Sequence, residues 1–344
     1  MEIIDLRSDT VTKPSQNMLN YMMGAELGDD VYAEDPTVNL LQSKVAELFA
    51  KDDALFVPSG TMSNQIALKI LTNPGDEVIA EKEAHIFYYE TAAPSILSNI
   101  QIRTIPSYNG MIPLEEIEKA IRPNDYYFPT TKVIALENTH NRHGGAILDL
   151  NYIKDVRRIA DKYDLMMHLD GARIWNATVA SGVPLMEYAK YFDTLSVCLS
   201  KGMGAPVGSL LMSTKENIKK AIKWRKIFGG GMRQAGILAA AGIYAIDNNY
   251  DKLINDHQNA KQFANLISKI DRIDCDIDRV QTNIVIFALH NTISPSSFVA
   301  KCKQKGLLLS AVGEQNIRVV FHLNISDDNM YSSIDIIESI IKEL

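Results

Sequence analysis

Three short apolar segments lie close together in the middle of the chain: LMMHLD (165–170), TLSVCLS (194–200) and GSLLMS (208–213). Each has the length and apolar content of a buried strand. A strand-like segment, KVIALE, also occupies 132–137, and residues 151–163 carry apolar side chains at helical spacing. Buried strands separated by helices indicate parallel pairing with crossover connections. We therefore predict an α/β domain in which helices sandwich a mostly parallel sheet.

The pattern changes near Asn248 and Asn249. Beyond this point we expect a helix at 251–270, a strand at 282–289, a helix at 295–305, strands in LLLS and IRVVFHL, and a last helix at 327–343. The expected domains are a large one at 1–248, N-terminal segment included, and a small α+β one at 249–344. A length of 344 residues also favours two domains, at roughly 150 residues each.

Composition and charge exclude several classes of protein. The chain has 35 basic and 42 acidic residues and a net charge of −7, whereas a nucleic-acid-binding protein normally presents a basic face. The longest weakly polar run, AGILAAAGIYAI at 235–246, is shorter than the ~20 residues that a membrane helix needs. We therefore expect neither a nucleic-acid partner nor a membrane partner.

The N-terminal sequence and the cysteines indicate the compartment. MEIIDLRSDT carries acidic residues early and no apolar core, so we expect no signal peptide. Cys198, Cys275 and Cys302 are too few and too scattered for a disulfide framework or a zinc site. A cytoplasmic location is the expectation.

Polar clusters follow four of the predicted strands. They are Pro58–Asn64 after LFV, Glu137–Asn141 after KVIAL, Asp170–Arg173 after LMMHL, and Lys201–Gly204 after TLSVCLS. Ligands of open parallel sheets bind beyond the carboxyl ends of the strands. We expect the four clusters to converge on one crevice.

Lys201 precedes the glycine-rich turn GMGAPVG. Desolvation at the edge of a crevice would lower its pKa and make its amine a nucleophile. A surface lysine at a strand end fits the same position. Lys201 alone therefore leaves both interpretations open.

Ser59, Gly60 and Thr61 form a turn that opens a helix, where backbone N–H groups and the helix dipole attract anions. An ordinary N-cap is the simpler interpretation. The chain has no GxGxxG or GxxxxGK[ST] motif after an early strand, which disfavours dinucleotide and nucleoside-triphosphate binding.

Asp170 and His85 each have a functional and a structural interpretation. Asp170, at a strand end, could ligate a metal, act as a base, pair with a ring nitrogen, or only cap the next helix. His85 could stack on a planar cofactor, act as a base, or pack as a structural residue. His140 and His143 lie three apart with no third ligand nearby in sequence, so we expect no metal site.

A nucleophilic lysine, an anion cradle, a strand-end acid and a stackable histidine in one crevice are together what pyridoxal 5′-phosphate (PLP) requires. The lysine would hold the aldehyde as a covalent aldimine, and the helix N-terminus would hold the phosphate. The acid would keep the pyridine nitrogen protonated. We expect PLP bound to Lys201.

The sequence resembles the low-specificity L-threonine aldolases, a family of fold-type-I PLP enzymes. The resemblance runs from DLRSDTVTKPS at 5–15 to the region around Arg318. It rests on the order and spacing of GDDVYAEDPTVN (28–39), SGTMSN (59–64), ENTHN (137–141), HLDGARIWNA (168–177), SKGMGAPVGS (200–209) and GGGMRQAGILAAAGIYA (229–245). It implies an aspartate-aminotransferase-like fold and cleavage of L-threonine or L-allo-threonine to glycine and acetaldehyde.

The resemblance assigns cofactor roles by position. Lys201 resembles the lysine of the aldimine, Asp170 the partner of the pyridine nitrogen, and His85 the histidine stacked over the ring. Gly60 and Thr61 match the phosphate-binding turn.

The resemblance also assigns substrate and interface roles. Arg173 lies on the cofactor and substrate-carboxylate side, and Ser8 and Arg318 match the groups that hold the substrate carboxylate. Arg233 resembles a phosphate ligand that the neighbouring subunit contributes. Tyr32 matches a tyrosine that is contributed across the dimer interface. Arg318 also alternates with apolar residues in NIRVVFHL, from which a guanidinium can bind a carboxylate with two hydrogen bonds.

The loop before KVIALE departs from the family. Tyr127 stands where family members carry a histidine that contacts the β-hydroxyl of the substrate, and Thr130 stands where they carry an arginine. A tyrosine can donate a hydrogen bond there, but near neutral pH it is not an equivalent base. The preference between threonine and allo-threonine therefore stays open.

Two alternatives also stay open. A related PLP enzyme could catalyse β-elimination or racemisation of a small amino acid with the same lysine, acid and phosphate site. A PLP-binding protein without turnover would have no need for the carboxylate clamp at Arg318. The interface residues imply a homodimer with shared active sites, and the resemblance favours a tetramer, which the sequence does not distinguish from a dimer.

Overall fold

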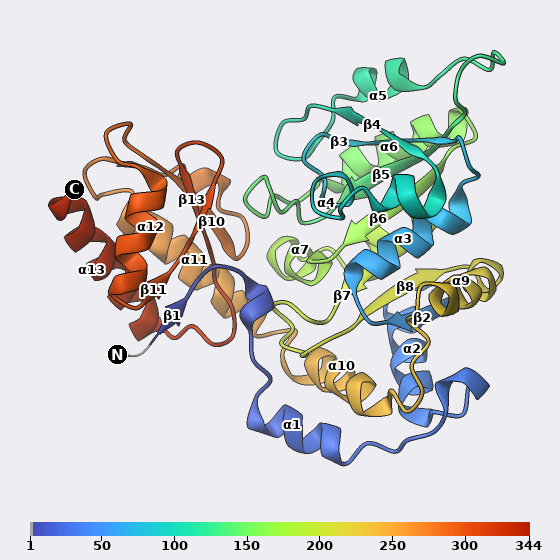
Figure 1. The fold of residues 1–344 in the computed structure, drawn as a ribbon, viewed down its shortest axis with the longest axis horizontal. Coiled ribbons are helices and arrows are strands. Elements are labelled where there is room, and N and C mark those ends of the chain that lie inside the picture. Colours follow the sequence, from blue (N-terminus) through green and yellow to red (C-terminus); the bar gives the residue numbers. More distant parts are fainter. Residues whose placement is uncertain (1–2) are drawn as a thin grey trace.

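A central sheet organises the larger part of the computed structural model, which describes residues 3–344 (Figure 1). Its strands are β2 (Asp53–Val57), β3 (Glu77–Glu81), β4 (Gln101–Ile105), β5 (Thr131–Glu137), β6 (Met166–Gly171), β7 (Thr194–Cys198) and β8 (Ser209–Ser213). Their spatial order is β2-β8-β7-β6-β5-β3-β4. Among these strands, β8 alone runs opposite to the other six, and the loop 199–208, without a crossover helix, connects it to β7. The predicted mostly parallel sheet is confirmed.

Helices cover both faces of this sheet. They are α1 (Gln16–Met23), α2 (Pro36–Leu48), α3 (Gly60–Leu71), α4 (His85–Tyr88), α5 (Leu114–Ala120), α6 (Leu150–Lys162), α7 (Ile174–Ser181), α8 (Leu185–Ala189), α9 (Lys215–Ile227) and α10 (Gly236–Asn248). Successive strand residues point to opposite faces. In β2, Ala54 and Phe56 join the core formed with α2, α6, α7 and α10, whereas Leu55 and Val57 join the core under α3 and α9.

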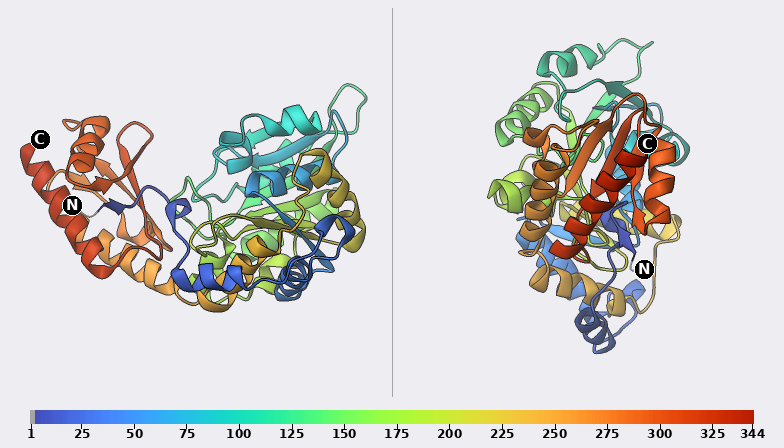
Figure 2. Two further views of the ribbon diagram at one scale, coloured as in Figure 1. Left: turned by 60° about the horizontal axis from the view of Figure 1, so that its bottom comes forward. Right: turned by 90° about the vertical axis from the view of Figure 1, so that its left-hand side faces the viewer.

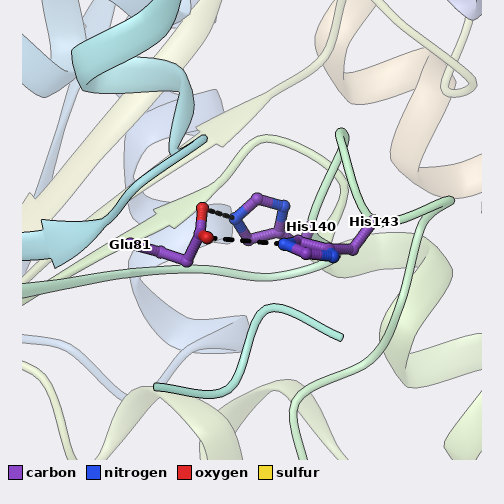
Figure 3. Close-up of side chains that lie close together, drawn as sticks. All are labelled: Glu81, His140 and His143. Atoms are coloured by element: carbon purple, nitrogen blue, oxygen red, sulfur yellow. Dashed lines mark hydrogen bonds and ion pairs between the residues drawn. The ribbon is translucent and has the colours of Figure 1, made fainter. Parts of the chain in front are cut away.

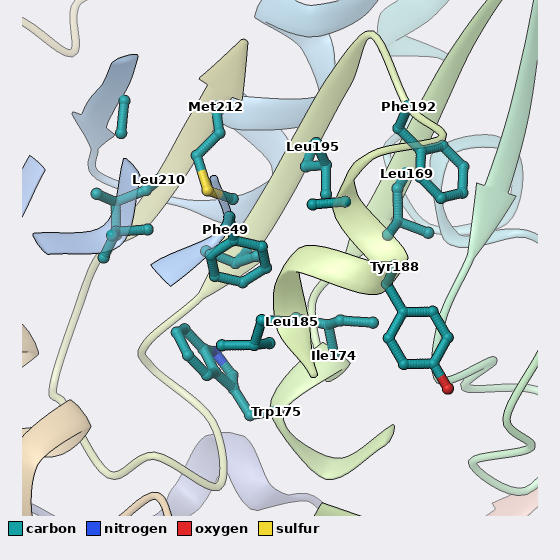
Figure 4. Close-up of a cluster of buried hydrophobic side chains, with 14 of the residues drawn as sticks. Phe49, Leu169, Ile174, Trp175, Leu185, Tyr188, Phe192, Leu195, Leu210 and Met212 are labelled. Carbon is teal, nitrogen blue, oxygen red and sulfur yellow. The ribbon is translucent and has the colours of Figure 1, made fainter. Parts of the chain in front are cut away.

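Large aromatic side chains fill the main core beneath the sheet (Figure 4). Trp175 of α7 meets Phe49 edge to face, with ring centroids 5.5 Å apart. Its indole Nε1–H donates a hydrogen bond of 2.9 Å to the carbonyl oxygen of Cys198. This buried contact holds the end of β7, three residues before Lys201.

The smaller part of the molecule has its own sheet and its own core. An antiparallel sheet of order β12-β13-β10-β9 is formed by β9 (Ile273–Asp274), β10 (Ile284–Leu289), β12 (Ser310–Val312) and β13 (Asn316–Val320). Helices α11 (Leu253–Ile267), α12 (Pro295–Gln304) and α13 (Asp327–Glu343) pack against this sheet and against one another (Figure 2). The predicted α+β character of this region is confirmed.

The N-terminal segment packs with the smaller part. Strand β1 (Ile4–Asp5) pairs in parallel with β11 (Leu307–Leu308), and Ile4 and Leu6 enter the smaller core. The prediction had assigned this segment to the large domain. The predicted division near residue 248 otherwise falls between α10 and α11. Every helix within residues 3–344 is too short or too polar to cross a bilayer.

Candidate active site

The carboxyl ends of β2, β3, β5, β6 and β7 share one edge of the sheet, as the strand register shows. Glu137 lies opposite Asp170, Asp170 opposite Ser196, and Cys198 opposite Ser209. The loops that follow these strands carry the four polar clusters. The four predicted clusters therefore lie at one edge of the sheet.

Lys201 follows β7 and is partly buried, with Nζ 3.2 Å from Sγ of Cys198. Burial lowers the pKa of Lys201, but Cys198 and the carboxylates of Asp9 and Asp170 act in the opposite direction, and the net shift is upward. The expectation of a lowered pKa is wrong, because negative charge in the crevice outweighs desolvation. The amine remains positioned at the crevice edge.

Asp170 ends β6 with its carboxylate buried. Its Oδ2 accepts a hydrogen bond of 2.8 Å from Nδ2 of Asn64, and its Oδ1 accepts one of 3.1 Å from the backbone N–H of Ala172. His168 lies 3.1 Å from Oδ1 of Asn64 and so fixes the orientation of that amide. The carboxylate is held in place and keeps lone pairs free for a ring N–H donor.

His85 begins α4, where its backbone N–H donates to Glu137 at 2.7 Å. Its Nδ1 lies 2.9 Å from Oε1 of Glu90. Burial lowers the pKa of His85, but its hydrogen bond to the Glu90 carboxylate and the charges of Asp170 and Glu137 raise it above its ordinary value. His85 is thus held by carboxylates on the same side of the crevice as Asp170.

The start of α3 provides an anion site. Ser59 is the N-cap and accepts a hydrogen bond of 3.2 Å from the N–H of Met62, so the simpler N-cap interpretation also holds. The N–H groups of Gly60 and Thr61, as first residues of the helix, have no partner within it. A Cβ on Gly60 would lie 2.7 Å from Sγ of Cys198, so a glycine is required for the close packing there.

Arg173 is committed to a buried ion pair with Asp9. Nε and Nη2 each donate to the Asp9 carboxylate at 2.7 Å. Burial would raise the pKa of Asp9, but Arg173 and Lys201 lower it to about 2. Arg173 therefore shapes the wall of the site with two of its donors already used, and Nη1 lies 3.4 Å from Oδ1 of Asn141.

Arg318 reaches from β13 of the smaller part towards the same crevice. Its Nη1 donates to Oδ1 of Asn141 at 3.0 Å and its Nη2 to the carbonyl oxygen of Arg7 at 3.2 Å. Nε is buried without a hydrogen-bond partner among residues 3–344. Ser8 follows Arg7, and Arg318 and Asn141 line a cleft of about 480 Å³ between the two parts. These positions suit a carboxylate ligand.

Three predicted residues lie apart from this group in the chain. Tyr32 is 71% exposed in a short helical turn, Asp30–Tyr32. Arg233 pairs with Asp29 at 3.0 Å on the same surface. Tyr127 is 65% exposed in the loop before β5, at the opposite end of that strand from Glu137. Their roles stay predictions.

Several residues of the site were missed in the sequence. Asp9 and Asn141 contact Arg173 across 164 and 32 positions of sequence, and Asn64 contacts Asp170 across 106. Glu90 contacts His85, five positions away. Three of them stand inside segments that were singled out, DLRSDTVTKPS, SGTMSN and ENTHN. Which side chains these residues contact depends on the fold and has no local signal in the sequence.

Comparisons with known proteins identify the family. The beta-eliminating lyase family matches residues 5–291. The low specificity L-threonine aldolase of Escherichia coli (strain K12) is 43% identical over 329 residues, which cover 95% of this chain and 96% of that protein.

Solved structures share the fold. A threonine aldolase from Leishmania major has a TM-score of 0.84 at 20% identity, with 97% of this chain and 98% of that chain covered. A structure of SPT with the PLP internal aldimine has a TM-score of 0.78 at 14% identity, with 99% and 88% covered. By its sequence, the chain belongs to the beta-eliminating lyase family and, within it, to the low-specificity L-threonine aldolases.

Proposed function

We propose that this protein is a PLP-dependent aldolase that cleaves L-threonine and L-allo-threonine to glycine and acetaldehyde. One observation carries the proposal: the amine of Lys201, the carboxylate of Asp170 and the free N–H groups at the start of α3 meet at one edge of the sheet. The 43% identical relative is named for this activity.

The residues present fit PLP. The N–H groups of Gly60 and Thr61 suit its phosphate, and Asp170 suits its pyridine nitrogen, because Asn64 and Ala172 hold the carboxylate without using all its lone pairs. Lys201 would bind the cofactor covalently through Nζ, with His85 beside the ring. When bound, PLP supplies an electron sink for negative charge at Cα of an amino acid.

Arg318 and Ser8 orient the substrate. A guanidinium binds a carboxylate with two parallel hydrogen bonds, which fixes the direction of the Cα–Cβ bond as well as the position of Cα. Arg318 already extends towards the crevice through Asn141 and the Arg7 carbonyl. Bond orientation decides which bond to Cα breaks, so the clamp favours cleavage of Cα–Cβ.

His85, or a water molecule that it positions, accepts the proton of the β-hydroxyl group. General base catalysis of this kind typically contributes ~10²–10⁴-fold. Because the pKa of His85 is raised, the ring is neutral and able to accept a proton only at a higher pH than an ordinary histidine. The reaction is therefore expected to be favoured at alkaline pH.

Product analysis tests the proposed reaction. The purified protein with PLP is incubated with L-threonine, L-allo-threonine and L-serine, and acetaldehyde, glycine, pyruvate and ammonia are measured. Acetaldehyde and glycine in equal amounts support the aldolase. Pyruvate and ammonia from serine without aldehyde from threonine would support β-elimination, which the name of the matching family model favours as the second candidate.

We also propose a cytoplasmic homodimer with shared active sites, or a tetramer built from it. Tyr32 and Arg233 lie on one exposed surface, because Arg233 pairs with Asp29 and its carbonyl oxygen accepts a hydrogen bond from the N–H of Asp30. This position suits contribution to the active site of a neighbouring chain. The three cysteines are free thiols, as a reducing compartment requires. Light scattering after size exclusion measures the number of chains in the assembly. Lys201→Ala and Arg233→Ala chains, each inactive alone, should regain activity when mixed only if two chains contribute to each active site.

A further inference from the structure

Glu81, His140 and His143 meet beside the candidate active site (Figure 3). Glu81 is the last residue of β3, and the two histidines lie in the segment 138–146 that follows β5. Oε2 of Glu81 is 3.0 Å from Nε2 of His140, and Oε1 is 3.4 Å from Nε2 of His143. The sequence offered only two ligands three residues apart, and the fold supplies the third.

The imidazole of His140 is buried and poorly satisfied. Its side chain is fully inaccessible, and neither of its nitrogens makes a hydrogen bond of acceptable geometry within residues 3–344. Two ligand atoms on one tetrahedral ion, each about 2.0–2.1 Å from it, lie about 3.3 Å apart, and the nitrogen lone pair then points beside the neighbouring oxygen. In the cluster, each histidine faces a different oxygen of Glu81, at 3.0 and 3.4 Å, and the ligand atoms of the three residues all lie within 4.8 Å of one another, close enough for one ion to reach all three.

The local charge also suits a cation. The negative charges of Glu81, Glu83 and Glu137 all lie close enough to His140 to influence its imidazole. Arg142, the nearby positive side chain, is already paired with Glu83 at 2.8 Å. The cluster therefore has more carboxylate than compensating positive charge.

We propose that Glu81, His140 and His143 bind a divalent transition-metal ion of the zinc type. Two imidazoles and a carboxylate form a ligand set that such ions prefer. Ser107 Oγ also touches the cluster, 2.9 Å from Oε1 of Glu81 and 3.2 Å from Nε2 of His143. His143 lines the cleft of about 480 Å³, which gives an ion a route inwards.

The ion would tie the segment 138–146 to the end of β3. This segment carries Asn141, whose Oδ1 accepts hydrogen bonds from Arg318 at 3.0 Å and Arg173 at 3.4 Å. A bound ion therefore stabilises the wall of the crevice without touching Lys201 or Asp170. The inference does not depend on which reaction the protein catalyses.

Zinc binding to the PLP-loaded protein tests the site. Wild type and three variants, His143→Ala, Glu81→Gln and His290→Ala, are equilibrated against ZnCl2, and zinc per chain and the Zn²⁺-dependent rise in Tm are measured. His290 is an exposed histidine outside the cluster and serves as the matched control. The PLP absorbance of the four proteins is compared first. Equal absorbance shows that each variant is folded, and it means that zinc bound by the cofactor itself contributes equally to all four.

The proposal predicts one tightly held zinc per chain in wild type and His290→Ala, with a rise in Tm, and loss of both in His143→Ala and Glu81→Gln. Equal zinc binding in all four proteins would overturn it and assign the zinc to adventitious surface groups. No tight binding to wild type would also overturn it and leave the cluster as an ion pair of Glu81 with two histidines.

Discussion

Oε1 of Glu90 lies 2.9 Å from Nδ1 of His85, and the Glu90 side chain is fully buried. Asn64 donates to the same oxygen at 2.9 Å and to Asp170 at 2.8 Å. One hydrogen-bonded chain thus runs from the residue expected beside the cofactor ring to the residue expected at its nitrogen. The orientation of His85 and of Asp170 is therefore coupled through Asn64.

Replacing Glu90 by Gln tests this coupling. The substitution removes a charge that raises the pKa of His85, so the acid limb of the pH profile of kcat/KM should move to lower pH. Asn64 and Gln65 both donate to Glu90, so a glutamine leaves one donor poorly paired, at a cost of about 1–3 kcal/mol. Steady-state kinetics across pH measure the shift, with the partly exposed Glu187→Gln on α8 as the control. An unmoved acid limb would contradict the role of Glu90.

The same variant should show a pH-dependent loss of stability. A histidine whose pKa is raised on folding adds stability below its unfolded pKa of about 6.5, and this is lost as pH rises through the folded value. Glu90→Gln should therefore lose more stability relative to wild type in acid than in alkaline solution. Urea unfolding at several pH values measures this, and a constant difference would count against the pKa shift of His85.

Arg318→Gln should weaken substrate binding. Hydrogen bonds to a charged group contribute about 1.5–3 kcal/mol, so we expect kcat/KM for L-threonine to fall about 10- to 100-fold, mainly through KM. The exposed Arg158→Gln change is the control, because Arg158 pairs with Asp155 on the surface of α6. A normal KM for Arg318→Gln would show that another group binds the carboxylate.

Trp175→Phe should destabilise the fold near Lys201. The change leaves the buried carbonyl of Cys198 without its 2.9 Å donor, which costs about 1–3 kcal/mol. Trp224→Phe is the matched control, since Trp224 is only partly buried and contacts Lys69. Denaturant unfolding compares the two, and equal small losses would refute the contribution of the Trp175 hydrogen bond.

Gly60→Ala should impair PLP binding. Its Cβ would lie 2.7 Å from Sγ of Cys198, so the start of α3 must shift, and overpacking of this kind costs about 1–3 kcal/mol. At Gly24 the nearest atom to a new Cβ is 3.6 Å away, and Gly24→Ala is the control. PLP titration followed by absorbance gives the affinity, which should fall only in Gly60→Ala.

Periodicity predicted the regular elements closely. The predicted helices at 151–163 and 327–343 are α6 (Leu150–Lys162) and α13 (Asp327–Glu343), and the segment TLSVCLS contains β7 (Thr194–Cys198). These patterns are local, because burial of one face repeats with the helix or strand period. Contacts between distant segments were not predictable in the same way.

The pairing of β1 with β11 joins residues about 300 positions apart, and nothing in Ile4–Asp5 specifies its partner. The contact of Glu81 with His140 and His143 could not be predicted either. It forms only because β3, which ends at Glu81, lies beside β5, which precedes the two histidines. The direction of the Lys201 pKa shift was wrong for a related reason. The shift depends on Cys198 and on the charge of Asp9, which comes near Lys201 only in the folded chain.

The central claim is that Lys201 holds PLP in a site that cleaves threonine. The most direct measurement records the visible absorbance of the PLP-loaded wild type and of Lys201→Ala before and after L-threonine is added, with acetaldehyde assayed in the same cuvette. We predict that the wild type has a visible absorbance band, which changes when L-threonine is added while acetaldehyde forms. We predict that Lys201→Ala lacks this lysine-dependent band and does not turn over L-threonine. A wild type that gains no visible band with PLP, or a Lys201→Ala variant that forms acetaldehyde at the wild-type rate, would contradict the account.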